Sequence, residues 1–213
     1  HLDHFKARFG VNRMGHRVEP GLYQIGNPTA ESPVFASANY TLSFDALRGS
    51  LADLDGYILV LDTKGINVWC AAGKGTFGTD ELVRSIVSSG LASVVCHRAI
   101  IVPQLGAPGI AAHEVKRRTG FRVEYGPVRV VDLPEYLSKK AASPHMRRVL
   151  FPLRDRLVLA PIELVHIALP AFIVAIVLWF LAGQVASIAA VMAIIAGTVL
   201  FPALLPYIPT RDY

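Results

Sequence analysis

The stretch that decides the fold runs from Tyr57 to Lys74 and reads YILVLDTKGINVWCAAGK. Its first residues are apolar and favour β structure, so they predict a strand buried on both faces of a sheet. A polar loop, residues 62–65, follows the strand, and Asn67 is a suitable N-cap for a short helix that begins at Val68. A strand, loop and helix in this order indicate an α/β domain.

The short helix carries a lone cysteine in its first turn. At about 100° per residue, Asn67, Cys70 and Lys74 share one face of the helix, whereas Val68 and Ala72 point the other way. The unpaired N–H groups of the first turn and the lysine one turn further on favour the ionised form of the thiol. The sequence therefore predicts a helix that presents a thiolate.

Other roles for Cys70 stay open on the residues alone. Its small neighbours, residues 71–73, would let a large flat group lie against the helix. A nucleophile with His97 or His113 as its base is an alternative that no spacing rule supports. A small hydrophobic residue buried in the core is the plainest alternative. A phosphate-binding loop is not expected, because a Walker A motif needs glycine in place of Val68 and serine or threonine in place of Gly75.

Strand-like and helix-like segments alternate around this unit. Strands are expected at Val34–Ala38, Ala92–Cys96, Ala99–Val102, Phe121–Glu124 and Val128–Val131, and helices at Ser43–Leu54, Ile110–Arg118, from Asp132 onwards, and from a Thr79 cap to Ser89. Alternation of this kind predicts a mostly parallel sheet with both faces covered. Ligands bind beyond the carboxyl ends of such strands, where residues 62–74, 103–109 and 126–127 lie.

The hydrophobic content of 53% is concentrated at one end of the chain. From Ile167 to Thr210, 44 residues carry no formal charge. As one helix this run would be about 66 Å long, twice the thickness of a hydrocarbon core. We therefore expect two transmembrane helices, Val158–Ala182 and Val185–Leu205, with a break at Gly183. Glu163 and His166, one helical spacing apart, are either functional or placed at the membrane interface.

Positive charge flanks the apolar segment. Four arginines precede it and one follows it: Arg147, Arg148, Arg154, Arg156 and Arg211. The positive-inside rule then predicts a cytoplasmic membrane protein with its N-terminal domain in the cytoplasm. Residues 1–156 carry a net charge of +6, which favours anionic lipid or an acidic partner. Nucleic acid is not an expected partner, because no basic-aromatic motif is present.

We divide the chain into an N-terminal leader (1–20), an α/β domain (21–145), a basic juxtamembrane linker (146–157) and the transmembrane helices (158–213). The two cysteines, Cys70 and Cys96, form no CxxC pair, and we expect no structural disulfide. Cys96 stands in an apolar run and is expected in the core. His97 is expected in a solvated turn or as a satisfied core histidine.

The sequence NVWCAAGK, residues 67–74, resembles the cap-helix signature of the membrane-bound corrinoid protein of microbial mercury methylation (the HgcA family), which is related to the large subunit of the corrinoid iron-sulfur protein. The resemblance covers roughly residues 20–165 and includes Gly26–Thr29, Asn39–Tyr40, Val60–Gly65, His97–Arg98, Pro103–Gly109, His113–Val115 and Tyr125–Arg129. The chain departs from that family in showing two membrane spans rather than several.

The resemblance implies a cytoplasmic Rossmann-like corrinoid-binding domain followed by membrane helices. It implies a corrinoid-dependent methyltransferase, in which methyl passes from methyl-cobalt(III) corrinoid to mercury(II), with the Cys70 thiolate as the lower axial cobalt ligand. Asn67 and Lys74 would support the sulfur. The implied corrinoid-binding residues are Thr63, Gly65, Asn67, Val68, Trp69, Cys70, Ala71, Ala72, Gly73, Lys74, Gln104, Gly106, Ala107 and Gly109. No iron-sulfur cluster is expected in this chain.

The partners implied by the resemblance are a ferredoxin-like iron-sulfur protein that reduces cobalt and delivers mercury, a methyl donor from the methyl-folate pathway, and membrane lipid. Two other functions compete with this interpretation. One is a corrinoid methyl carrier of one-carbon (folate/acetyl-CoA pathway) metabolism, for which mercury is an incidental acceptor. The other is a non-enzymatic, membrane-tethered binding module whose cysteine is merely buried.

Overall fold

The computed structural model describes residue 9, residues 15–158 and residues 160–208. The chain divides into two units, Met14–Val149 and a second that contains Leu150–Tyr213. Most of the expected leader (1–20) and Arg211, the arginine expected after the second span, lie outside the described residues.

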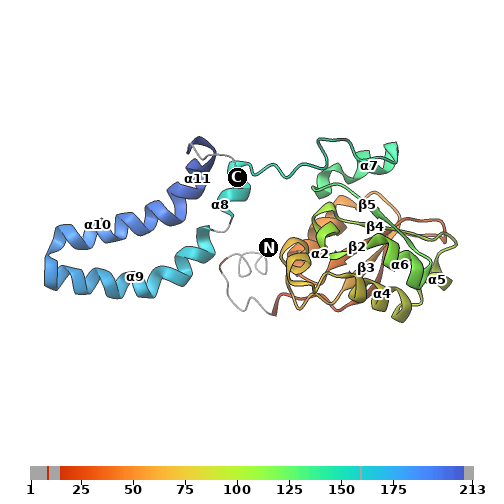
Figure 1. Cartoon of the computed structure of the whole chain (residues 1–213), viewed down its shortest axis with the longest axis horizontal. Coiled ribbons are helices and arrows are strands. Elements are labelled where there is room, and N and C mark those ends of the chain that lie inside the picture. The colour runs from red at the N-terminus through yellow and green to blue at the C-terminus, as the bar shows by residue number, and fades with distance from the viewer. Residues whose placement is uncertain (1–8, 10–14, 159, 209–213) are drawn as a thin grey trace. The chain divides into compact units, whose positions relative to one another are not determined.

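The first unit is built on a five-stranded sheet with helices on both faces (Figure 1). The strand order is β1-β3-β2-β4-β5, and only β1 is antiparallel to its neighbour. The strands are β1 (Gly21–Ile25), β2 (Val34–Ala38), β3 (Gly56–Leu61), β4 (Ala99–Val102) and β5 (Arg122–Tyr125). The prediction of an α/β fold with a mostly parallel sheet is confirmed.

The two central strands form the core of this unit. Every residue of β2 and β3 is buried, as expected for strands covered on both faces. Side chains alternate along β3, so Leu59 and Leu61 enter one hydrophobic cluster while Ile58 and Val60 enter the other. The uninterrupted apolar run in the sequence therefore reflects burial on both sides of the sheet.

Each face of the sheet is covered by its own set of helices. On one face lie α3 (Val68–Lys74), α4 (Thr79–Ser88), α5 (Leu91–Val94) and α6 (Ala112–Thr119). On the other lie α2 (Thr41–Ser50) and α7 (Leu133–Lys139). Two 3-10 turns, η2 (Gln104–Gly109) and η3 (Val130–Asp132), complete the connections.

Two expected strands are not strands, and one strand was not expected. Residues 92–96 belong mainly to helix α5, because Leu91 and Val95, one helical turn apart, both reach the core. Residues 128–131 leave the sheet after Pro127, and Val128 N–H donates to Met146 O at 2.8 Å. The strand β1 was not expected, because its residues are only partly buried and its sequence shows no clear alternation of polar and apolar side chains.

The expected cap at Thr79 is also wrong. Gly78 is the N-cap of α4, and Thr79 is its first residue. Thr79 Oγ1 instead accepts a hydrogen bond from Ala111 N–H at 2.8 Å and lies 3.4 Å from Gly109 O. The hydroxyl therefore ties α4 to the segment between β4 and α6.

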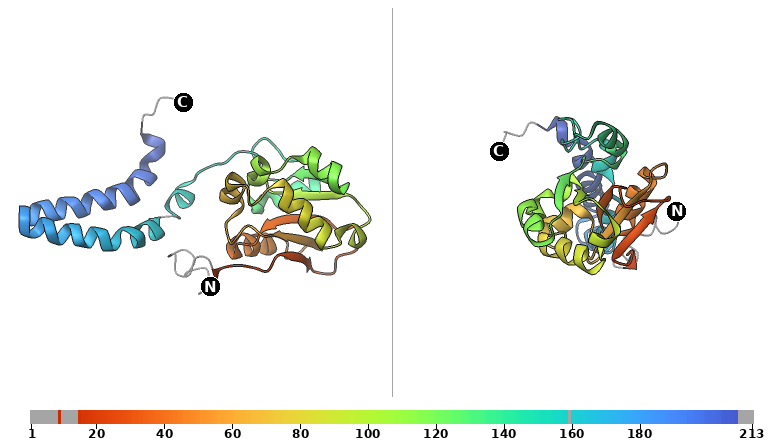
Figure 2. Two further views of the ribbon diagram at one scale, coloured as in Figure 1. Left: turned by 60° about the horizontal axis from the view of Figure 1, so that its bottom comes forward. Right: turned by 90° about the vertical axis from the view of Figure 1, so that its right-hand side faces the viewer.

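The second unit is a helical hairpin, preceded by α8 (Leu153–Leu157), in which α9 (Ala160–Ala182) and α10 (Gln184–Ile195) lie side by side (Figure 2). Gly183, with φ of +87°, makes the predicted break. Ser187 Oγ donates to Ala175 O at 2.8 Å and links the two helices. By length and composition, Leu153–Ala182 and Gln184–Tyr207 are apolar enough to cross a membrane. A membrane location stays a prediction.

The second arm of the hairpin is interrupted near its end by prolines. Residues Ala196–Leu200 are π-helical, and the N–H of Phe201 donates to Ala196 O, five residues earlier. The next residue, Pro202, has no N–H and cannot continue this hydrogen-bond pattern. The short helix α11 (Phe201–Leu204) and the turn η5 (Leu205–Tyr207) follow. Arg156 Nη1 donates hydrogen bonds to the carbonyls of Pro202 and Ala203. In a regular helix the Pro202 carbonyl would accept from the N–H of residue 206, which is a proline and has none.

Candidate functional site

Helix α3 is capped at both ends, which fixes the position of Cys70. The Asn67 side chain accepts a hydrogen bond from Cys70 N–H at 2.9 Å, and Asn67 itself is extended, as an N-cap requires. At the other end Gly75 takes a left-handed conformation with φ of +78°. The predicted helix and its Asn67 cap are confirmed.

The outer face of α3 is formed by Trp69, Cys70, Gly73 and Lys74, which are all exposed. Cys70 is therefore not a buried core residue, and that alternative is wrong. On the inner face, Ala71 and Ala72 are 0% and 6% exposed and belong to the core. Both alanines were expected to contact a flat ligand, but they face the sheet instead.

The outer face is open around the cysteine. A Cβ atom placed on Gly73 would meet no atom within 4 Å outside the helix itself. Trp69 is 51% exposed on the same face. The helix thus presents a thiol beside a glycine and an indole, with nothing packed above the glycine, and this surface can accept a broad flat group.

The loop before α3 is held by Asn39, which follows β2. Asn39 is 3% exposed, and its Oδ1 accepts hydrogen bonds from the backbone N–H groups of Thr63 and Gly65 at 3.0 and 2.9 Å. Thr63 is fully buried, and its Oγ1 lies 2.9 Å from Asn39 Oδ1 and 2.7 Å from Ile66 O. Thr63 therefore shapes the loop and offers no group to a ligand on the outer face.

Gly65 also serves the loop. Its φ of +73° favours glycine, and a Cβ there would lie 2.8 Å from Arg17 Nε. The resemblance implies that Thr63 and Gly65 contact the cofactor, and it implies no such role for Asn39. The role of Asn39 could have been inferred from its position directly after β2, a fully buried parallel strand, because polar side chains at such strand ends often bind the neighbouring loops.

An ion pair closes the outer side of the same loop. Lys64, with φ of +60°, pairs with Asp62, whose Oδ1 also accepts the Lys64 N–H at 3.1 Å. The hydrogen bond from the Lys64 side chain lowers the pKa of Asp62, although burial opposes the shift. Asp62 N–H donates to Glu81 Oε1 at 3.1 Å, so the loop is tied to α4 as well.

The η2 turn supports α3 from behind. A Cβ on Gly109 would lie 2.1 Å from Phe77 O and 3.2 Å from Ala72 Cα, and one on Gly106 would lie 2.5 Å from Phe77 Cε1. Both glycines, named from the sequence as pocket residues, are needed for this close packing. Ala107 is half-buried, and Gln104 Oε1 accepts a hydrogen bond from Arg147 Nη1 at 2.6 Å.

The histidines do not pair with Cys70. His97 precedes β4 and α3 follows the parallel strand β3, so the two lie at opposite ends of the strands. The Nε2 atom of His97 lies 2.9 Å from Ser32 O. His113 is exposed on α6, and its Nε2 is 3.8 Å from a Glu114 carboxylate oxygen. Cys96, expected in the core, is exposed, and its Sγ lies 3.3 Å from Ala30 O. Both cysteines are free thiols, as expected.

Comparison with known proteins relates the α/β unit to subunits of acetyl-CoA-synthesising complexes. A family model described as CdhD, CO dehydrogenase/acetyl-CoA synthase delta subunit, matches residues 9–137. The gamma subunits of the acetyl-CoA decarbonylase/synthase complex from Methanopyrus kandleri and Methanothermobacter thermautotrophicus are 36% and 33% identical to this chain over 131 and 132 residues. The matches cover 60% and 61% of this chain and 28% of each relative. The chain thus spans little more than a quarter of their length.

These findings correct the expected family. The matching model is named for CO dehydrogenase/acetyl-CoA synthase and the reported relatives for acetyl-CoA decarbonylase/synthase. Neither name refers to mercury methylation, so the assignment to the HgcA family is wrong. The assignment of a mercury methyltransferase, with mercury(II) as substrate, is wrong for the same reason. The most specific part of that resemblance is residues 67–74, whereas the family model matches almost the whole α/β unit.

Proposed function

The chain belongs to the CdhD family, CO dehydrogenase/acetyl-CoA synthase delta subunit, and on that premise we propose that its α/β unit is a Rossmann-like corrinoid-binding methyl carrier of one-carbon metabolism. The relatives are subunits of a complex whose name combines decarbonylation and synthesis of acetyl-CoA. The observation that supports the proposal best is the exposed thiol of Cys70 on a helix capped at both ends.

The residues of α3 fit a corrinoid. Thiolate sulfur is a soft ligand that suits a transition metal, and Cys70 has its side chain at the surface. Gly73 leaves the adjoining surface open, and Trp69 adds an exposed flat ring beside it. When bound there, a corrinoid supplies a cobalt centre that accepts and releases a methyl group. Cys70 would then hold the cobalt through its sulfur.

The surrounding residues hold this surface in place. Asn67 fixes the backbone at Cys70 through its 2.9 Å hydrogen bond, and Lys74 contributes a positive charge on the exposed side of the same helix. Ala71 and Ala72 anchor the helix in the core, while Asn39, Thr63 and the η2 glycines keep its base rigid. Their proposed role is to position the cysteine, while Trp69, Cys70 and Gly73 on the outer face contact the ligand.

The partners follow from the family and are proposals of the same kind. The relatives are parts of a multi-subunit complex, so the α/β unit would exchange its methyl group with other subunits of such a complex. An iron-sulfur protein would return the metal to its reduced state, and a methyl-folate would supply the methyl group. The apolar helices and their arginine flank support attachment to the cytoplasmic membrane with the α/β unit inside.

Reconstitution tests the proposal. Full-length protein in detergent micelles, incubated with hydroxocobalamin and freed of excess, should retain about one cobalt per chain. The visible absorption spectrum of the bound corrinoid should change in Cys70→Ala. Cys96→Ala is the matched control, because Cys96 is also an exposed thiol but lies in the segment before β4.

The two parts of the proposal can fail separately. If the wild-type protein retains no corrinoid, the carrier function is wrong. If corrinoid is retained and its spectrum is the same in wild type and Cys70→Ala, the carrier function stands and the ligand role of Cys70 is wrong.

A further inference from the structure

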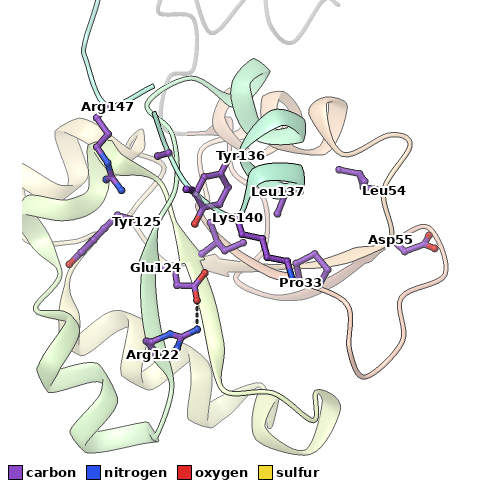
Figure 3. A pocket seen from close by; sticks show the side chains of 13 residues that line it. Pro33, Leu54, Asp55, Arg122, Glu124, Tyr125, Tyr136, Leu137, Lys140 and Arg147 are labelled. Carbon is purple, nitrogen blue, oxygen red and sulfur yellow. Dashed lines mark hydrogen bonds and ion pairs between the residues drawn. The ribbon is translucent and has the colours of Figure 1, made fainter. Parts of the chain in front are cut away.

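A cleft of about 860 Å³ lies on the other face of the sheet from Cys70, over β4 and β5 and beside α7 (Figure 3). Ile101 of β4 and Leu137 of α7 give it apolar walls. A smaller hollow of about 200 Å³ continues it and shares Pro33, Ile101 and Glu124. Clefts that hold small molecules have volumes of roughly 300–1,000 Å³. None of the residues assigned to the corrinoid surface lines this cleft.

The cleft exists because this face of the sheet is incompletely covered. Helix α7 ends at Lys139, and Lys140 turns the chain away with φ of +51°. On β5, Val123 faces the core on the other side, so Arg122 and Glu124 face the cleft. These two side chains form an ion pair at 2.5 Å where a covered sheet would carry apolar residues.

Tyr136 is a buried residue with an unused polar group. It is only 6% exposed, and its ring packs in the core with Leu133 and Met146. Its hydroxyl has no hydrogen-bond partner among the residues that the structure describes, and Figure 3 shows it pointing into the cleft on the side of Glu124. Burial raises the pKa of Tyr136, so the hydroxyl is a protonated donor near neutral pH.

The charges around the cleft favour an anion. Arg122 and Glu124 neutralise each other, whereas Asp55, whose Oδ1 accepts the Asn27 N–H at 2.8 Å, keeps its negative charge. Lys140 and Arg147 form no ion pair within the described part of the chain; Arg147 hydrogen-bonds only to the neutral amide of Gln104. The three basic residues Arg122, Lys140 and Arg147 outnumber the two acidic residues Asp55 and Glu124, so the lining carries a net charge of +1.

We propose that this cleft binds a small organic anion with a flat apolar body. Lys140 holds its charged group, Tyr136 donates a hydrogen bond to an acceptor on its body, and Ile101 and Leu137 contact its apolar part. Arg147 adds positive charge on the other side of the cleft (Figure 3). The site is separate from Cys70 and does not depend on the proposed corrinoid function.

Calorimetric titration of the full-length protein in detergent micelles tests the proposal, with protein-free micelles as the blank. Adenosine 5′-monophosphate and 2-naphthoate are the anionic probes and distinguish a phosphate from a carboxylate. Adenosine and 2-naphthamide are their neutral counterparts. At least one anion should bind with a dissociation constant of roughly 1 mM or tighter, and its neutral counterpart about tenfold more weakly.

Two variants locate the site. Tyr136→Phe keeps the ring in the core and should weaken binding about fivefold, and Lys140→Gln should weaken it by a similar factor. Lys139→Gln is the matched control, because Lys139 pairs with Glu135 and does not line the cleft. Cys70→Ala should bind the anion as the wild type does, whatever happens to corrinoid.

Three results would each overturn the proposal. These are no binding of either anion, equal binding of an anion and its neutral counterpart, and unchanged affinity in both Tyr136→Phe and Lys140→Gln. Circular dichroism of each variant shows that the fold is kept before affinities are compared.

Discussion

The two faces of helix α3 differ: one packs against the core and the other is exposed to solvent. On the inner face, Ala71 and Ala72 are buried against the core and the η2 turn. On the outer face, Cys70 and Gly73 are exposed, with no atom packed over the glycine. The difference shows that several residues predicted to touch a cofactor, among them Thr63, Ala71 and Ala72, are buried, whereas Cys70 and Gly73 lie at the surface.

The largest expected effect comes from the support. Gly109→Ala would place a Cβ 2.1 Å from Phe77 O, a backbone atom that cannot move aside easily. We expect a loss of about 3 kcal/mol in the free energy of unfolding. Urea unfolding followed by circular dichroism measures it. A variant as stable as wild type would show that η2 does not need its close approach to α3.

Loss of the Asn39 side chain should have the next largest effect. Asn39→Ala leaves the buried N–H of Thr63 and that of Gly65 without their acceptor. The expected cost is about 2 kcal/mol, in the same unfolding measurement. Asn27→Ala, in which an exposed asparagine is changed, serves as the control and should cost much less.

Gly73→Ala separates the two faces most cleanly. Its backbone is helical and a Cβ there meets nothing within 4 Å, so the change should stabilise the protein by about 0.5 kcal/mol. If the outer face carries the corrinoid, the same change should weaken corrinoid retention several-fold. Unaltered retention would argue that the ligand does not lie over position 73.

The smallest expected effect is a pH dependence from the loop. Because its hydrogen bond with Lys64 lowers the pKa of Asp62 below 3.8, this carboxylate stabilises the fold above about pH 4 and ceases to do so as the pH falls through its folded-state pKa. Between pH 6 and pH 3 the wild type should therefore lose slightly more thermal stability than Asp62→Asn. Equal losses would mean that the pair with Lys64 contributes nothing.

The sequence predicted best what is decided locally. β2 and β3 are continuous apolar runs, and Asn67 is a strong cap, so these elements and the exposure of Cys70 could be inferred. The same helical spacing also puts Ala71 on the side of Val68 and Ala72, toward the core. The small size of residues 71–73 indicates room for a flat ligand, but their angular positions place Ala71 and Ala72 toward the core and only Gly73 at the surface.

What the sequence could not predict depends on contacts between distant segments. Thr63 is held by Asn39, 24 residues earlier, and Gly106 and Gly109 pack against Phe77. Cys96 stands in an apolar run, yet the turn after α5 leaves it at the surface. The cleft beside α7 was also missed, because its residues come from five separate parts of the chain and share no motif.

The central claim is that Cys70 supplies sulfur to cobalt from the outer face of α3. Cobalt X-ray absorption of the full-length protein loaded with corrinoid measures this directly. We predict a sulfur atom among the nearest neighbours of cobalt in the wild type and in Cys96→Ala, and its loss in Cys70→Ala. A wild-type spectrum that shows only nitrogen and oxygen ligands would contradict the account.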